Sequence, residues 1–162
     1  MSMSDRLIVM NAGGIEQSGR PDEVYRNPRT AFAADFMGRS NSFPILAASV
    51  QDRVVELQTA IGRLIASDAD AGDARPGSRV FVRPEHVAVA PPGPPQGEAN
   101  SLPGRVRRTT FLGAASSVEI ELSDGAVLLA LVPNGTEPLP YLAPGAEIVA
   151  RIPPAALKIL QH

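Results

Sequence analysis

The sequence predicts a mainly β protein made of short antiparallel strands, and three observations support this prediction. The 162-residue chain contains sixteen prolines and fourteen glycines, which separate short runs of Val, Ile and Leu. Several of these runs alternate apolar and polar residues, as strands with one buried face do. The hydrophobic content of 44% is ordinary for a globular protein, so a packed core is expected.

A hairpin and two short helices are expected first. Residues 6–18 read as an apolar strand, a glycine-containing turn and an alternating strand, which is the pattern of a β-hairpin. Acidic residues after Pro21 predict a helix over residues 21–26, because carboxylates favour the positive end of a helix. A second helix is expected over residues 29–37, with Gly38 as its terminator.

Strands are expected along the rest of the chain. They cover residues 43–50, 54–58, 62–67, 79–83, 86–90, 104–112, 117–122, 126–132 and 147–152. Two loops interrupt them. Residues 68–76 are acidic and rich in small side chains, and residues 91–100 contain Pro-Pro-Gly-Pro-Pro, which is excluded from a central strand. The second loop is the predicted boundary inside the β region.

The composition excludes several classes of function. The absence of cysteine rules out disulfides, thiolate metal sites and cysteine nucleophiles. A formal net charge of −2 argues against a general nucleic-acid binder. The one lysine, Lys158, does not follow a glycine, so no phosphate-binding GxxxxGK[ST] loop is present. Neither a signal peptide nor a membrane-spanning apolar run is recognisable, which predicts a cytoplasmic protein.

Two sets of sequence blocks resemble a known family. Near the N-terminus, residues 5–11, 14–17, 19–25, 27–28 and 32–38 resemble the end of importer-type ABC ATPases, just after the switch histidine. Further along, residues 82–87, 104–113 and 123–125 resemble the transport-associated OB domain, called TOBE, of maltose-type and polyamine-type importers. The resemblance covers nearly the whole chain.

This resemblance implies a fold and a division of the chain. The expected fold is an OB-like antiparallel barrel or sandwich, preceded by the hairpin and two helices. Residues 1–40 would be the C-terminal remnant of the ABC nucleotide-binding domain, and residues 41–162 the TOBE domain.

The resemblance also implies a function. The chain would be the regulatory and dimer-stabilising C-terminal region of the ATP-binding subunit of a bacterial ABC uptake transporter. Residues 38–43 resemble subunits for polyamine or iron more than those for sugars. The expected partners are a second ATPase subunit and the transmembrane permeases, at the inner face of the cell membrane, with no nucleic acid.

No enzymatic activity is expected of the chain itself. In this family ATP hydrolysis depends on a P-loop lysine, a carboxylate base, an LSGGQ signature and a histidine, and none of these can be placed in the sequence. We therefore assign no catalytic, cofactor-binding or metal-binding residue. The full-length parent would use ATP and magnesium.

Two other functions are compatible with the sequence. One is a free-standing OB-type module that binds an oligonucleotide or oligosaccharide, and the other is a structural spacer without a ligand. Arg105, Arg107 and Arg108 near Phe111 would suit the first, because OB folds bind single strands through basic and aromatic side chains. A solvated strand face explains the same arginines, and the acidic balance favours that interpretation.

The compact motif Arg83-Pro84-Glu85 is the candidate interface. Proline lacks an amide donor and ends a strand, which leaves Arg83 and Glu85 to form a braced corner or to meet another subunit. Two weaker signals receive structural interpretations. The acidic run 68–73 has its glycine one place early for a calcium loop, and His86 and His162 are too few for a metal site.

The N-terminal segment carries apolar surface that needs cover. Residues 7–10 form a continuous apolar run, typical of a strand that is covered on both faces, and Phe32 and Phe36 form an apolar stripe one helical turn apart. We expect this segment either to dock on a neighbouring chain, through edge pairing or exchange, or to remain disordered and prone to association.

Overall fold

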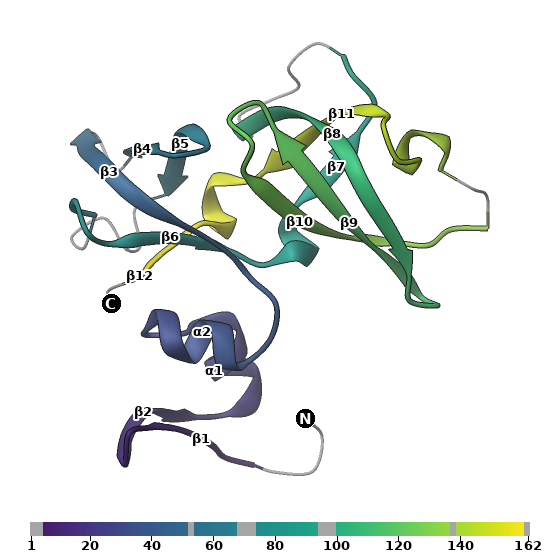
Figure 1. Ribbon diagram of the computed structural model, residues 1–162. Coiled ribbons are helices and arrows are strands. Elements are labelled where there is room, and N and C mark those ends of the chain that lie inside the picture. The colour runs from purple at the N-terminus through teal and green to yellow at the C-terminus, as the bar shows by residue number, and fades with distance from the viewer. Residues whose placement is uncertain (1–4, 52–53, 68–73, 94–99, 137–138, 161–162) are drawn as a thin grey trace.

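The structure is a computed structural model that describes residues 5–51, 54–67, 74–93, 100–136 and 139–160 (Figure 1). Two five-stranded antiparallel sheets and a two-stranded N-terminal sheet make up its architecture. The mainly β prediction, with a preceding hairpin and two short helices, is confirmed. Within the described residues, no helix is long and apolar enough to span a membrane.

The N-terminal sheet is a hairpin of β1 (Leu7–Asn11) and β2 (Gly14–Gly19). Its turn residues Ala12 and Gly13 have φ values of 47° and 85°. Positive φ at both central positions is the requirement of the tight turn that matches the twist of paired strands, and glycine meets it without strain.

The two helices that follow pack on the inner face of this hairpin. They are α1 (Pro21–Arg26) and α2 (Ala31–Phe36), and the Thr30 side chain caps α2 by accepting a hydrogen bond from the Ala33 amide at 3.1 Å. Val9, Val24 and Ala33 form a small buried cluster between strand and helices. Residues 5–38 therefore have a small core of their own.

The first large sheet has the strand order β12-β6-β3-β4-β5. Its members are β3 (Asn41–Gln51), β4 (Val54–Thr59), β5 (Gly62–Ser67), β6 (Arg79–Val82) and β12 (Lys158–Leu160). Alternation along β4 and β5 directs Val55, Leu57, Leu64 and Ala66 into the core.

The second large sheet has the strand order β7-β11-β8-β9-β10. Its members are β7 (Ala88–Ala90), β8 (Asn100–Phe111), β9 (Ala115–Leu122), β10 (Val127–Pro133) and β11 (Glu147–Ile152). Short 3-10 turns connect several strands: η2 (Pro84–His86), η3 (Pro140–Leu142) and η4 (Pro154–Ala156).

The two large sheets repeat one pattern. The first half (residues 41–90) and the second half (residues 100–160) each begin with Asn-Ser-x-Pro, and each runs through a hairpin, a third strand, a Pro-Gly turn and a Pro-led 3-10 turn. Pairing is in the same register in both halves, with Asn41 opposite Val82 and Asn100 opposite Ile152. The β region is therefore a tandem duplication.

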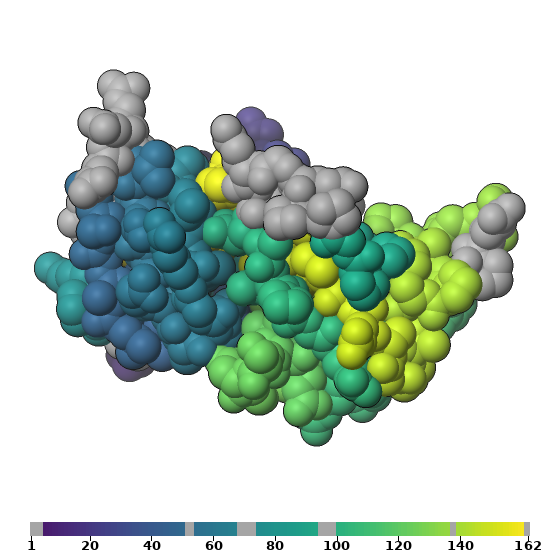
Figure 2. Space-filling view, turned by 90° about the horizontal axis from the view of Figure 1, so that it is seen from above, coloured from purple at the N-terminus to yellow at the C-terminus, as the bar shows by residue number. Residues whose placement is uncertain are grey.

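Each half gives its last strand to the other half's sheet. From the first half, β7 pairs with β11, with Ala88 opposite Arg151. From the second half, β12 pairs with β6, with Lys158 opposite Phe81. The space-filling view shows the blue atoms of the first half beside the green and yellow atoms of the second (Figure 2). The two halves are interlocked.

Two buried asparagines join the sheets at equivalent places. The Asn41 carboxamide oxygen accepts a hydrogen bond from the Leu129 amide at 2.7 Å, and its Nδ2 donates to the Leu129 carbonyl at 2.9 Å. The Asn100 carboxamide makes the same two bonds to Ile65, at 2.6 and 2.9 Å. Each asparagine thus satisfies the outer backbone groups of an edge strand of the opposite sheet.

One apolar core lies between the sheets. It combines Val55, Leu57 and Leu64 of the first sheet with Ile120, Leu128 and Ile148 of the second. Because most of the buried apolar side chains lie in this shared cluster, neither half retains a complete core without the other.

Most expected strands agree with the structure in position. The expected strands 62–67 and 147–152 agree residue for residue, whereas strand 86–90 begins at Ala88 because Pro84–His86 forms a 3-10 turn. The short strand β12 was not expected, since it has three residues and follows two prolines. The division of the chain at residue 40 stays a prediction.

Candidate functional site at the Arg83 joint

Arg83 lies at the corner where β6 gives way to η2, and it is only 3% exposed. Its guanidinium carbon is 4.2 Å from the centroid of the Tyr25 ring and 4.9 Å from that of the Phe81 ring. A cation held against two aromatic rings benefits from their negative faces, most strongly where water is excluded. Arg83 is therefore clamped between the N-terminal segment and the β region.

The same guanidinium binds the ends of both N-terminal helices. Nη2 donates to the Tyr25 carbonyl in the last turn of α1, and Nη1 donates to the Ala34 carbonyl in the last turn of α2, both at 3.2 Å. The last carbonyls of a helix have no partner within it and carry partial negative charge. A buried arginine satisfies two such ends at once, because its rigid fork presents several donors.

Glu85 makes a second contact with Tyr25. The Tyr25 hydroxyl donates to Glu85 Oε1 at 2.6 Å, across a separation of 60 residues. Burial and the hydrogen bond to the Glu85 carboxylate raise the pKa of Tyr25, while the Arg83 charge opposes the rise. Both charged residues of the motif therefore contact the same tyrosine.

Pro84 and a small apolar contact complete the joint. Pro84 is buried at the first position of η2, where a proline costs no hydrogen bond. Ala34 of α2 is buried against Phe81 of β6 and Leu160 of β12. We call this set of contacts, made by Arg83, Glu85, Tyr25 and Ala34, the Arg83 joint.

The joint faces only one side of the N-terminal segment, and the other side is apolar and open. Val9 is fully buried, but Ile8, Met10 and Ile15 are exposed on the outer face of the β1–β2 hairpin. On α2 the rings of Phe32 and Phe36 stack with centroids 6.1 Å apart and are also exposed. The chain's own helices therefore cover one face of the apolar strand 7–10, and the other face stays exposed.

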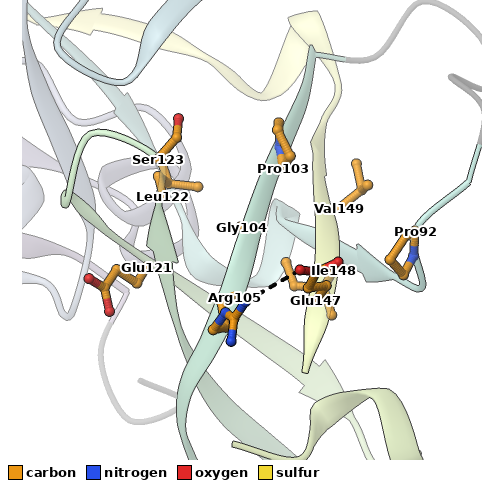
Figure 3. A pocket seen from close by; sticks show the side chains of 10 residues that line it. All are labelled: Pro92, Pro103, Gly104, Arg105, Glu121, Leu122, Ser123, Glu147, Ile148 and Val149. Atoms are coloured by element: carbon orange, nitrogen blue, oxygen red, sulfur yellow. Dashed lines mark hydrogen bonds and ion pairs between the residues drawn. The ribbon is translucent and has the colours of Figure 1, made fainter. Parts of the chain in front are cut away.

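A groove crosses the second sheet at Gly104 (Figure 3). Its volume is about 520 Å³, and its lining includes Pro92, Leu122 and Val149. Arg105 and Glu147 pair at 3.3 Å on one rim and are both largely exposed. A Cβ on Gly104 would lie 2.7 Å from Ile120 Cγ2 and 2.8 Å from the Glu121 carbonyl oxygen. Glycine is therefore required at this position, because any larger residue would collide with β9.

The arginines of β8 lie on an exposed strand face. Arg105 pairs with Glu147, Arg108 pairs with Glu119, and Arg107 is exposed. The hydrogen bond and charge of Arg108 lower the pKa of Glu119. Because two of the three arginines have acidic partners, this face resembles an ordinary solvated surface more than a groove that binds single-stranded nucleic acid.

The remaining sequence signals contribute no site. His86 is exposed on η2. Residues 68–73, which suggested a calcium loop, and His162 lie outside the described residues.

Several functional residues were not expected from the sequence. Tyr25 and Ala34, the partners of Arg83, gave no local signal. Asn41 and Asn100 did carry one, because both begin an Asn-Ser-x-Pro block, and the repetition of that block marks the duplication.

Comparisons with known proteins point to one family. The family model of the TOBE domain matches residues 80–160. A sulfate/thiosulfate import ATP-binding protein of Chromobacterium violaceum is 36% identical over 98% of this chain. A spermidine/putrescine import ATP-binding protein of Pseudomonas fluorescens is 30% identical over 90%, and an Fe(3+) ions import ATP-binding protein of Agrobacterium fabrum is 32% identical over 80%.

The chain spans 42%, 38% and 35% of the lengths of these relatives, respectively. Among solved structures, the cytoplasmic molybdate-binding protein ModG matches with a TM-score of 0.63 and 18% identity, over 76% of this chain and 96% of that one. This likeness concerns the fold, and with the family match it confirms the expected OB-like architecture.

Proposed function

Because the chain belongs to the TOBE domain family and resembles ABC-importer ATP-binding subunits over nearly its whole length, we propose that it is the regulatory, dimer-stabilising C-terminal region of such a subunit. The Arg83 joint is the observation that carries this proposal. It connects a segment similar to the end of an ATPase domain to the duplicated β region through one buried cation. Movement of either part is thereby transmitted to the other.

In this proposal, residues 1–40 are the last part of the nucleotide-binding domain. The exposed apolar face of Ile8, Met10 and Ile15 packs against the preceding part of that domain. Burying a large aliphatic side chain is worth about 1.5–3 kcal/mol, so three of them supply a substantial contact. The hairpin and helices are then shared between the ATP-binding core on one side and the Arg83 joint on the other.

The chain itself performs no ATP chemistry in this proposal. It has no GxxxxGK[ST] loop to hold phosphates, so we expect neither tight ATP binding nor hydrolysis from the purified chain. Magnesium-dependent ATP turnover that persists through a second purification would contradict this expectation.

Cargo and partners follow from the relatives by analogy. Their names specify sulfate or thiosulfate, spermidine or putrescine, and Fe(3+) ions. Of these we propose a polyamine or iron, on the resemblance of residues 38–43. The subunit would work as a homodimer with membrane permeases, at the cytoplasmic face of the membrane.

A chimaera tests the proposal. Residues 5–160 replace the matching region of the Pseudomonas fluorescens relative, and ATP hydrolysis and spermidine uptake are measured in permease-containing vesicles. We expect both activities to be retained, and the Arg83→Ala chimaera to uncouple hydrolysis from uptake. A chimaera that is folded by circular dichroism yet neither joins the permease nor hydrolyses ATP would contradict the proposed function.

A further inference from the structure

A cavity lies where the N-terminal segment meets β12, the edge strand beside the two helices (Figure 1). Its volume is about 440 Å³. Gln17 of β2, Glu23 of α1 and residues 27–29 line one side of it, and Lys158–Leu160 line the other. Leu160 also packs against Ala34, so the cavity adjoins the Arg83 joint. A molecule bound here would contact both parts of the chain at once.

Gln17 holds one wall of the cavity in place. Its Nε2 donates to the Asn27 carbonyl and its Oε1 accepts from the Arg29 amide, both at 2.9 Å. Pro28, between these two residues, is buried and has a fixed φ. The start of the Arg29 side chain is therefore set by the fold, and a wall that is ordered before binding loses little entropy when a ligand arrives.

Two cations and one carboxylate line the cavity. Arg29 comes from the N-terminal segment, Lys158, the one lysine of the chain, comes from β12, and Glu23 comes from α1. Among the described residues, no acidic side chain forms an ion pair with Arg29. Guanidinium and ammonium groups only donate hydrogen bonds, and their bonds to carboxylate or phosphate oxygens are among the strongest in proteins. The cavity therefore favours an anion.

We propose that this cavity binds a small dianion, whose carboxylate or phosphate oxygens are held by Arg29 from one side and by Lys158 from the other. Two negative charges match the two cations and outweigh the repulsion by Glu23. The Lys158 ammonium has three donors, so it can hold an anion in addition to another partner. The described lining residues include no aromatic ring on which a base could stack, so a compact ligand fits better than a nucleotide.

Such a ligand fastens the two parts of the chain together. It contacts Arg29 and Lys158 at once only while the N-terminal segment lies against β12, so binding stabilises that arrangement as the ligand concentration rises above the Kd. The fastening adds to the permanent one at Arg83. Its regulatory consequence rests on the proposed function, in which the N-terminal segment belongs to the ATP-binding domain, whereas binding of the anion does not.

Isothermal titration calorimetry of the 162-residue chain with inorganic phosphate and with malonate tests the site. At least one anion should bind at a single site, and the tighter of the two identifies the acidic group of the ligand. Arg29→Gln should raise the Kd at least about 10-fold, as loss of a charge-assisted hydrogen bond does, and it keeps the main-chain bond to Gln17. The matched control is Arg26→Gln, which removes the same charge from an exposed residue outside the lining and should leave the Kd unchanged.

A second variant should improve binding. Glu23→Gln should lower the Kd by about 3-fold, because the neutral side chain no longer repels the anion. A gain of affinity does not arise from misfolding, so this result also guards against damage to the fold. Hydrogen exchange measures the fastening: the anion should slow amide exchange in residues 20–38 of the wild-type chain and not in Arg29→Gln.

The outcomes separate the inference from the proposed function. No binding of either anion, an unchanged Kd in Arg29→Gln, an equal loss in Arg26→Gln, or no gain in Glu23→Gln would overturn the site. Binding that leaves exchange in residues 20–38 unchanged would overturn the fastening. The proposed function survives each of these results, because the chimaera tests it separately. A chimaera that fails while the 162-residue chain still binds the anion would overturn the proposed function and leave the site standing.

Discussion

Arg83 makes most of the polar contacts in the joint. It stacks on Tyr25 and Phe81 and donates to two helix ends, while the apolar part of the contact amounts to Ala34 with Phe81 and Leu160. A joint made mainly of polar contacts is specific in orientation, because its donors and acceptors fit in only one arrangement. It is also easily weakened by a single substitution.

The bond between Tyr25 and Glu85 predicts a change in a tyrosine pKa. Because burial and the Glu85 carboxylate raise the pKa of Tyr25, the bond contributes stability below the ordinary tyrosine pKa and loses it as pH rises through the raised value. We expect Glu85→Gln to lower the pKa of Tyr25. An alkaline titration followed by the tyrosinate absorbance near 295 nm measures this pKa, which is about 10 for an ordinary tyrosine. A Tyr25→Phe chain identifies its share of the signal. The same titration curve for wild type and Glu85→Gln would contradict the assigned cause.

At the level of elements, the asparagines replace strand pairing with side-chain pairing. Asn41 and Asn100 each occupy both backbone groups of one residue in an edge strand and also donate to the strand beside them, at Val82 and Ile152 respectively. This covers part of an edge that would otherwise be free to pair with another chain. It also ties the two sheets together at two equivalent points.

Removing either carboxamide should destabilise the β region to a similar extent. Asn41→Ala and Asn100→Ala each leave buried amide and carbonyl groups unpaired, which costs about 2–4 kcal/mol in the free energy of unfolding. Urea unfolding measures the change. Asn11→Ala is the control, because Asn11 makes a single exposed bond to Glu16, and its cost should stay below about 0.5 kcal/mol. A negligible effect at Asn41 or Asn100 would show that the sheets hold together without them.

The sequence predicts elements better than it predicts their partners. The strand 62–67 is recognisable because Leu64 and Ala66 alternate with exposed residues, which is a local pattern. The pairing of β12 with β6 and the contact of Arg83 with Tyr25 join segments far apart in the chain, and neither has a periodic signature. The Asn-Ser-x-Pro repeat is the exception, since it reveals the duplication from the sequence alone.

For the whole molecule, the exchange of β7 and β12 makes the halves interdependent. Both sheets depend on a strand from the other half, and one core lies between them. A substitution that destabilises one half should therefore destabilise the other half as well. This interdependence fits the regulatory role that we propose for the region.

Deleting residues 153–162 tests the exchange. The deletion removes η4 and β12, so hydrogen exchange should rise most at Arg79–Val82, where β12 pairs, although those residues belong to the other half. If β12 paired with β11 of its own half instead, the loss of protection would appear at Glu147–Ile152. Mass spectrometry of deuterated peptides distinguishes the two results.

The coupling of the N-terminal segment to the β region through Arg83 is the central claim, and hydrogen exchange of the Arg83→Ala chain tests it most directly. Loss of two hydrogen bonds and a cation–π contact, about 2–3 kcal/mol, should speed amide exchange in residues 20–38 by roughly 30- to 150-fold and leave β8 and β9 unchanged. The exchange rate of the Arg83→Lys chain should lie between those of wild type and Arg83→Ala. The Arg63→Ala chain, which loses an exposed ion pair with Glu56, should exchange at the wild-type rate. Unchanged exchange in residues 20–38, or a uniform rise over the whole chain, would contradict the claim.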